Sequence, residues 1–301
     1  MQLGLFSVSY AGLWGQHRLD VEAFIGKAAE LGYASVMLMA KRPHISPLDT
    51  HESELAGLRA ALKRHGISCG AVAGYTDFSR PRAAEVPTIE MQISYVESLA
   101  SMAAALDARL VRVFTAYEVE HETPTATWNL VVASIRECAD RAAAHGITLA
   151  VQNHHDVAVH TDALLELLLD IDRPNVKISF DAWSPALRGE DLYDAARRAA
   201  PYAAMTTNAD YLRLPRFGYR GDLVNYEPLL PDMARAVCFG TGSIDYEAFF
   251  RGLVDGGFPT DGLANFEICS PIRGGGCLQN LDDCARGYVD WMRRHVLNAA
   301  I

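Results

Sequence analysis

Short apolar runs alternate with longer amphipathic segments along the whole chain, and this alternation predicts the fold. The apolar runs have the length of buried strands and lie at about 3–8, 35–40, 68–73, 110–115, 148–152, 176–181, 203–207 and 263–267. Segments with helical periodicity follow them at about 20–32, 51–65, 88–106, 127–145, 161–170, 190–200, 245–256 and 280–298. Strands that alternate with helices indicate a parallel sheet with right-handed crossovers. Eight such units predict one α/β domain over residues 1–301, a (β/α)8 barrel.

The residues between these segments agree with the alternation. Glycines follow several of the predicted helices, as at Gly32, Gly66 and Gly146, where a left-handed residue commonly ends a helix. Asp20 and Asp245 precede predicted helices and are suitable N-caps. No Pro/Gly-rich linker divides the chain, so we expect a single domain.

One connection, at about 208–244, is too long for an ordinary loop between a strand and a helix. It follows the seventh predicted strand, on the side where barrel active sites lie, so we expect a lid or a binding loop. Arg213, Arg216 and Arg220 alternate in it with aromatic residues, and arginine suits the capture of carboxylate or phosphate. A solvated surface segment is the alternative interpretation.

Composition and charge narrow the function. Half of the 301 residues are hydrophobic, but no apolar stretch reaches the roughly 18 residues of a membrane span, and we expect no membrane partner and no signal peptide. The net charge of −10 disfavours a nucleic-acid partner. The six cysteines include no C-x-x-C pair and lie among apolar residues. This usage is typical of a reducing cytoplasm, so we expect a cytoplasmic protein without a disulfide framework.

Polar residues stand at the ends of three predicted strands. Glu267 lies in the apolar run Leu263–Cys269, Asp181 ends the strand at 176–181, and Gln152-Asn153-His154-His155 ends the strand at 148–152. A buried carboxylate must be paired, metal-bound or catalytic, because its desolvation is costly. Since barrel active sites form at the carboxyl ends of the strands, we expect these side chains to meet in one site.

The order and spacing of these motifs resemble the xylose isomerase-like superfamily, specifically its sugar phosphate isomerase/epimerase branch. The resemblance rests on Val111-Arg112-Val113-Phe114, on 146–154, on Phe180-Asp181, on 240–246 and on Phe266-Glu267. It implies a TIM barrel with a divalent metal (Mn²⁺, Mg²⁺, Co²⁺ or Zn²⁺) held at the strand ends by Glu, Asp, His and Glu. It also implies that the two glutamates move the proton of the substrate carbon.

The metal-ligand set departs from the family pattern at two positions. Asp181 and Glu267 match the family's aspartate and last glutamate, whereas Gln152 stands in place of the first glutamate and Thr207 in place of the histidine. The resemblance therefore implies a metal set of Gln152, Asp181, Thr207 and Glu267, with weakened affinity. Gln152 cannot act as a base, so we expect Glu267 to work with His154 or, failing that, His155.

Further polar residues follow the predicted strands and could contact a substrate. The candidates are Arg42, His44, Asp77, Arg112, Asn208, Asp210 and Arg216. For several of them, a solvated turn or a structural hydrogen bond is the alternative interpretation.

These observations together predict an isomerase or epimerase. We expect it to act on a small sugar, sugar phosphate or cyclitol by metal-assisted proton transfer next to a carbonyl. A dehydratase-type lyase on a similar polyhydroxylated substrate and a metal-free sugar-binding barrel remain alternatives. The outer helices of barrels often pair, so a homo-oligomer is also open.

Overall fold

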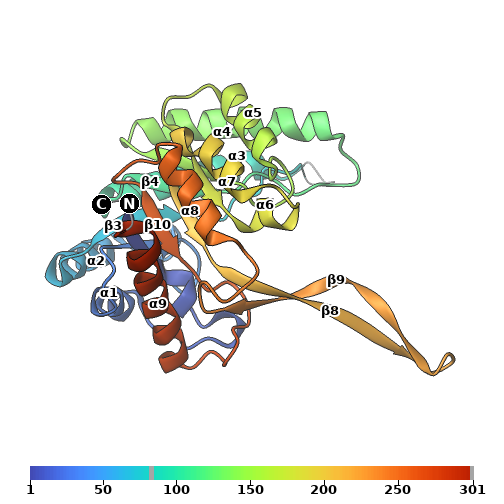
Figure 1. Cartoon of the computed structure of the whole chain (residues 1–301). Coiled ribbons are helices and arrows are strands. Elements are labelled where there is room, and N and C mark those ends of the chain that lie inside the picture. Colours follow the sequence, from blue (N-terminus) through green and yellow to red (C-terminus); the bar gives the residue numbers. More distant parts are fainter. Residues whose placement is uncertain (81–84, 299–301) are drawn as a thin grey trace.

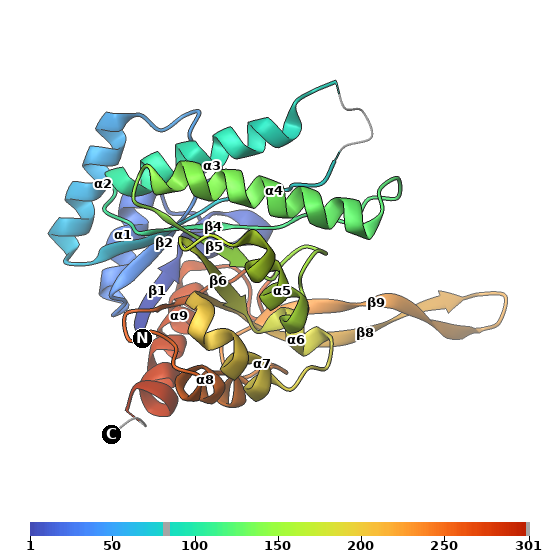
Figure 2. The same ribbon diagram turned by 90° about the horizontal axis from the view of Figure 1, so that it is seen from above.

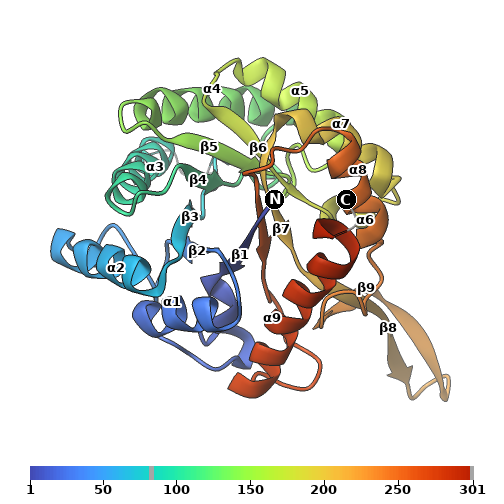
Figure 3. The same ribbon diagram turned by 60° about the vertical axis from the view of Figure 1, so that its left-hand side comes forward.

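Eight parallel strands close into a barrel that is surrounded by helices, as the computed structural model of residues 1–80 and 85–298 shows (Figures 1 and 3). The order around the barrel is β1-β10-β7-β6-β5-β4-β3-β2, with β1 also paired with β2. The strands are β1 (Gln2–Phe6), β2 (Ser35–Met39), β3 (Ser68–Ala73), β4 (Leu110–Val113), β5 (Thr148–Gln152), β6 (Val176–Asp181), β7 (Ala203–Asn208) and β10 (Leu263–Phe266). This confirms the predicted (β/α)8 barrel and all eight of its strands.

The helices cover the outside of the barrel, and every predicted helix is present. They are α1 (Val21–Glu30), α2 (Glu52–His65), α3 (Thr88–Ala105), α4 (Pro124–Ala143), α5 (Thr161–Ile171), α6 (Trp183–Leu187), α7 (Leu192–Ala199), α8 (Tyr246–Asp255) and α9 (Leu278–Met292). The short α6 was not predicted. The predicted N-caps are confirmed, since Asp20 accepts from Ala23 N and Asp245 from Ala248 N, at 2.8 and 2.9 Å. None of the helices in the described residues combines the length and the apolarity that a membrane span requires.

Alanines and methionines fill the interior of the barrel. The side chains of Ala71, Ala73 and Ala150 are fully buried and leave room for Met37 and Met205 to pack across the axis. Such a mixture of small and long residues is suited to filling a narrow cylinder. A larger apolar cluster lies between the strands and the surrounding helices.

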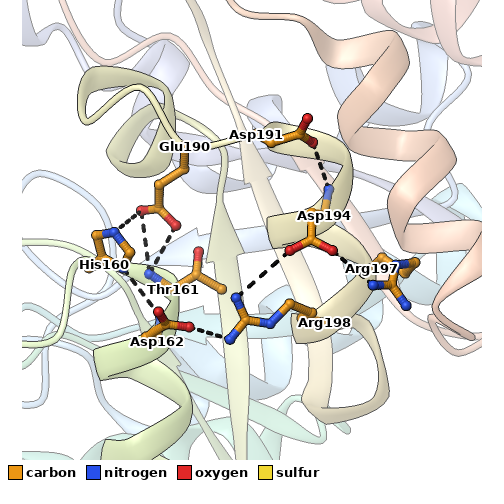
Figure 4. Close-up of polar contacts among 8 residues, drawn as sticks. All are labelled: His160, Thr161, Asp162, Glu190, Asp191, Asp194, Arg197 and Arg198. Carbon is orange, nitrogen blue, oxygen red and sulfur yellow. Dashed lines mark hydrogen bonds and ion pairs between the residues drawn. The ribbon is translucent and has the colours of Figure 1, made fainter.

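The amino ends of α5 and α7 are joined by a polar network (Figure 4). His160 caps α5 and Asp191 caps α7, each by accepting a backbone N–H of its helix. The ion pairs are Arg198 with Asp162 and Asp194, and Arg197 with Asp194. These pairs are partly exposed, so each contributes little to stability, and the network mainly fixes how α5 and α7 lie against each other.

The long connection after β7 forms an antiparallel ribbon. Its strands β8 (Asp210–Arg220) and β9 (Asn225–Val237) project from the barrel as an arm (Figures 1 and 2). Only its base lies near the carboxyl end of the barrel, where Tyr211 packs on Trp183 with ring centroids 4.6 Å apart. Most of the segment therefore projects away from the barrel, and its role as a lid or a binding loop stays a prediction.

One pair of cysteines differs from the sequence-based expectation. Cys238, just after β9, forms a disulfide with Cys284 in α9. The sequence predicted no disulfide framework and did not indicate this single bond. The other four cysteines, at 69, 138, 269 and 277, are free thiols.

Candidate active site

Three of the predicted site residues meet at the carboxyl end of the barrel. Gln152 ends β5, Asp181 ends the neighbouring β6, and Glu267 follows β10, which is separated from β6 only by β7. The Nε2 of Gln152 donates to Oδ2 of Asp181 at 3.0 Å. Thr207 lies in register with Asp181 on β7. All four residues are buried, so the convergence predicted from the strand ends is present.

The carboxylate of Asp181 is held by the ends of β5 and β6. The Nδ2 of Asn153 donates to the carbonyl oxygen of Asp181, and Asp181 N donates to Oδ1 of Asn153, at 2.9 and 2.7 Å. Trp183 N donates to Oδ1 of Asp181 at 2.8 Å. Burial nevertheless raises the pKa of Asp181 to about 6, and the hydrogen bonds from Trp183 N and Gln152 to its carboxylate only partly offset the desolvation. Asp181 is thus fixed in position and is easily protonated.

Glu267 has the most suitable pKa for proton transfer. Burial, followed by the charge of Asp181, raises the pKa of Glu267 to about 7, while Cys269, Arg112 and Lys41 oppose the rise. The thiol of Cys269 donates to Oε2 of Glu267 at 3.0 Å. A carboxyl group whose pKa lies near neutral pH can both take and return a proton, which general acid–base catalysis requires.

Arg112 on β4 is a cation inside the barrel mouth. Its side chain is only 1% exposed. Its guanidinium carbon lies 3.8 Å from the ring centroid of Phe114 and 4.9 Å from that of Tyr75, both within cation–π range. Within the described residues, its Nε and Nη1 have no hydrogen-bond partner, and neither does the buried hydroxyl of Tyr75.

Lys41 adds a second cation to the same region. Its Nζ lies 3.9 Å from the ring centroid of Tyr75. Burial lowers the pKa of Lys41, and the nearby Arg112 contributes to the decrease. The mouth of the barrel thus holds two carboxyl groups and two basic groups. In the described residues, neither base is within ion-pairing distance of a carboxylate.

Comparison with known proteins agrees with this arrangement. Residues 25–295 match the family described as xylose isomerase-like TIM barrel. The chain belongs to this family. No curated protein matches it in sequence.

Solved structures show the same fold at low sequence identity. D-psicose 3-epimerase from Clostridium cellulolyticum H10, solved with D-tagatose, is 19% identical with a TM-score of 0.74, and the match covers 98% of this chain and 99% of that one. An L-ribulose 3-epimerase is 16% identical with a TM-score of 0.74, over 99% and 95% of the two chains. The probable 3-DHS dehydratase AsbF from Bacillus anthracis is 17% identical with a TM-score of 0.72, over 97% and 99%. At such identities the likeness establishes the fold and leaves the reaction open.

The donor groups fit a divalent cation poorly. Within residues 1–80 and 85–298, no three side chains of the His, Cys, Asp and Glu types are placed to share a metal ion. Of the set that the resemblance implies, Gln152 turns its amide N–H toward Asp181, and Thr207 offers only a neutral hydroxyl that lies 3.4 Å from another hydroxyl. The remaining pair, Asp181 and Glu267, shares its surroundings with the Arg112 cation. Two carboxyl groups beside a fixed positive charge are a weak site for a second cation.

The two candidate histidines lie at the rim of the barrel. Their Nδ1 atoms are 2.8 Å apart, and both rings pack against Phe114, with centroids 4.6 and 4.4 Å away. Although His154 is exposed as a residue, desolvation of its ring and the nearby charges lower the pKa of His154 to about 3. The pKa of His155 is lowered in the same direction, mainly by burial. Both imidazoles are thus neutral near pH 7, and their proposed catalytic role stays a prediction.

Two of the predicted substrate contacts, Asn208 and Asp210, have structural partners in this fold. Asn208 donates to Tyr288 of α9 at 3.0 Å, because side chains alternate along β7 and Asn208 faces the helices where Thr207 faces the interior. Asp210 accepts the backbone N–H groups of Gly240 and Gly242, at 3.0 and 2.7 Å, and fixes the base of the arm. The amide nitrogen of Asn208 and the carboxylate of Asp210 thus hold structural contacts, and the substrate contacts expected of both residues stay predictions.

His44 and Arg42 after β2 also have local partners, and their substrate contacts stay predictions. His44 contacts the hydroxyl of Ser7 and the carbonyl oxygen of Leu19, at 2.9 and 3.2 Å, so both ring nitrogens are occupied. Arg42 is an exposed residue that forms a bidentate pair with Asp49. Each side chain has found a local partner, which is the alternative that the sequence left open.

The remaining candidates differ in position. Arg216 is exposed on the arm, where its Nη1 donates to a backbone carbonyl at 3.2 Å. Asp77 is half-buried after β3 and accepts the backbone N–H of Ser79 at 3.0 Å. The structure therefore brings Arg112 to the carboxyl groups, places Asp77 near the rim and leaves Arg216 outside the site.

Sequence reasoning missed Cys269 and considered Lys41 only together with Arg42 and His44, as cations after the second strand that could hold an anion or sugar hydroxyls. Cys269 follows Glu267 by two residues, and that spacing in an extended segment places both side chains on one face. Lys41 directly follows a fully buried strand, at the end where the active site forms. Both signals were readable in the sequence.

Two large surface cavities lie away from these residues. One of about 830 Å³ lies between α2 and α3, and one of about 810 Å³ lies beside α1 and α2. In the described part of the chain, none of the five clearest cavities is lined by Gln152, Asp181 or Glu267. Large side chains such as Arg112 and Tyr75 fill the barrel mouth, so the chemistry of its groups is a better guide to the site than its volume.

Proposed function

We propose that this chain catalyses proton transfer next to a carbonyl group in a small polyhydroxylated substrate, as a sugar isomerase or epimerase. The observation that carries the proposal is Glu267, a buried carboxyl group at the barrel mouth with a pKa of about 7. The family and its epimerase neighbours support the substrate class. The barrel fold alone would not support this substrate class, since barrel enzymes catalyse many unrelated reactions.

The reaction follows from one well-placed base. Glu267 takes the proton from the carbon next to the carbonyl, and the electron pair of the C–H bond moves toward the carbonyl oxygen. Return of the proton to the neighbouring carbon, together with transfer of the hydroxyl proton to the former carbonyl oxygen, interconverts an aldose and a ketose and needs only one face of the substrate. Return to the opposite face of the same carbon gives an epimer and needs a second acid. Asp181, whose pKa is about 6, is the available group, because Gln152 cannot donate a carboxylic proton.

A lyase is the second candidate. One base that removes a proton next to a carbonyl also starts β-elimination of a hydroxyl group, and a neighbouring fold is that of a probable dehydratase. The two candidates share the first step and differ in whether a hydroxyl group leaves the adjacent carbon. The product therefore distinguishes them.

The test is NMR in D2O with a panel of aldoses, ketoses, their phosphates and inososes. We expect deuterium to enter the carbon next to the carbonyl of one substrate with the native protein, and Glu267→Gln to lower the rate at least 10³-fold. Glu166→Gln, on the exposed face of α5, is the matched control and should behave as the native protein. An unsaturated or deoxy product would instead establish the lyase. Exchange that survives in Glu267→Gln would refute the role of Glu267.

A further inference from the structure

We propose that Arg112 and Lys41 form an oxyanion-binding site at the barrel mouth that makes a divalent cation unnecessary. The ligand is a negatively charged oxygen of the substrate: the oxygen of a carbonyl group as it becomes an enediolate, or the carboxylate of a sugar acid. The catalytic part of this inference rests on the proposed function, whereas the binding part can be tested without it.

The first argument is the set of unused donors. Arg112 is almost completely buried, yet its Nε and Nη1 have no acceptor among the described residues, and the hydroxyl of Tyr75 beside it has none either. Buried polar groups are nearly always hydrogen-bonded, and an unpaired guanidinium is more costly to bury than a neutral group. The guanidinium binds two oxygens of a carboxylate through Nη2 together with either Nε or Nη1, and each of these two edges of Arg112 contains an unpaired nitrogen. The unpaired nitrogens of Arg112 are therefore suitable donors to a ligand with acceptor oxygens.

The second argument is the confinement of the cation. Arg112 lies against Phe114 and Tyr75, and a third ring, that of Phe6, lies 5.7 Å away. The rings hold the guanidinium by cation–π contacts and exclude water from its faces. Its unpaired nitrogens therefore face a region of low dielectric, where a bound oxyanion is attracted more strongly than in water.

The third argument is the balance of charge. Arg112 and Lys41 together carry two positive charges, and Asp181 and Glu267 carry two negative charges when both are ionised. When Glu267 takes the proton of the substrate carbon, the four groups are left with a net charge of +1. The electron pair of the broken C–H bond becomes the new C=C bond, and the carbonyl oxygen becomes the oxyanion that this charge neutralises. The step needs no oxidant, reductant or metal.

The net charge of these four groups also limits the charge of the ligand that can bind. Once Glu267 holds a proton, the net charge of +1 matches a single negative charge on the ligand, whereas the double charge of a phosphate group would exceed it and be repelled by Asp181. We therefore assign the site to a carboxylate or an enediolate. Open-chain sugar acids of four to six carbons combine that charge with hydroxyl groups, and they serve as probes for both.

The first experiment measures binding of D-erythronate, D-arabinonate and D-gluconate by calorimetry in the presence of EDTA. We expect the native protein to bind at least one of them, and Arg112→Met to weaken binding by about 10- to 100-fold, as the loss of a charge-assisted bidentate contact implies. Lys41→Met should weaken it less, and Arg112→Lys should restore it in part. Arg59→Met, at an exposed arginine paired with Asp107 on the outside of α2, is the matched control.

Aldonate binding tests the oxyanion site, whereas proton exchange in D2O tests the proposed catalysis. Lack of aldonate binding by the native protein in EDTA would overturn the oxyanion site, and so would equal binding by a folded Arg112→Met. If Arg112→Met does not fold, aldonate binding by Lys41→Met and Arg112→Lys is measured instead. Binding by both that equals that of the native protein would overturn the oxyanion site. Glu267→Gln should keep or improve aldonate binding while it abolishes exchange in D2O, so the site can stand even where no substrate exchanges.

A second experiment addresses the cation directly. We expect titration of the chelator-treated protein with Mn²⁺ to show no stoichiometric binding, and aldonate affinity to be the same with and without the metal. Stoichiometric Mn²⁺ binding that disappears in Asp181→Asn would contradict the inference. It would establish a metal site in spite of the donor set.

Discussion

Replacement of Glu267 by glutamine should stabilise the folded protein at alkaline pH even though it abolishes catalysis. The pKa of Glu267 is raised from 4.5 to about 7, mainly by burial. Above pH 7 the carboxylate is ionised in the folded and the unfolded chain, and the folded chain bears the full cost of a buried charge. Glutamine has nearly the same shape and carries no charge, so the cost disappears.

The magnitude follows from the pKa. A difference of one pH unit corresponds to about 1.4 kcal/mol, so a rise from 4.5 to about 7 corresponds to about 3 kcal/mol of unfolding free energy. The sign is fixed by linkage: the folded chain holds the proton more tightly, so its stability falls as pH rises from 4.5 to about 7. Below 4.5 both states are protonated and the cost is absent. The advantage of Glu267→Gln should therefore be small at pH 5 and reach up to about 3 kcal/mol at pH 8.

Urea denaturation followed by circular dichroism at pH 5, 6, 7 and 8 measures this difference. Glu166→Gln, at the surface, should track the native protein at every pH. A pH-independent difference between Glu267→Gln and the native protein would refute the reasoning, since it would mean that Glu267 does not titrate in this range. A glutamine variant that is less stable at pH 8 would show that the carboxylate is well solvated or paired.

Three further predictions concern single contacts and the arm. Cys269→Ala removes the thiol that donates to Glu267, so the pKa of that carboxyl group should rise and the acidic limb of the pH–rate profile should move to higher pH, unlike in Cys277→Ala. Asn153→Ala breaks two buried hydrogen bonds to the end of β6 and should lower the urea-derived unfolding free energy by about 2–4 kcal/mol. Replacement of 213–234 by a tight turn should leave a folded barrel with native far-ultraviolet dichroism, because this part of the arm projects from it.

The eight strands were predictable because each is buried in the closed sheet. Val36, Met37 and Leu38 are fully buried on β2, for example, and such strands read as continuous apolar runs. The arm was not predictable as a ribbon, because prolines at 215, 228 and 231 interrupt its apolar alternation. Proline is tolerated there since a two-stranded ribbon has only edges.

The site was predictable in position and less so in detail. Glu267, Asp181 and Gln152 meet because their strands end at the same side of the barrel. Which neighbour faces inward depends on strand register, and one step along β7 turns Asn208 toward Tyr288. The unpaired guanidinium of Arg112 could not be foreseen, since it depends on side chains from three other strand ends.

The neutral amide of Gln152 and the buried guanidinium of Arg112 together set the net charge of the site. Gln152 donates to Asp181 at 3.0 Å. A glutamate in its place would bring two carboxyl groups into contact, and one of them would have to keep a proton because two like charges cannot both ionise at that distance. A divalent cation could relieve that repulsion, but the region already contains the charge of Arg112. The neutral amide keeps the number of carboxylates equal to the number of cations supplied by Arg112 and Lys41. Restoring glutamate at 152 alone would upset this balance without creating the remaining ligands of a metal site.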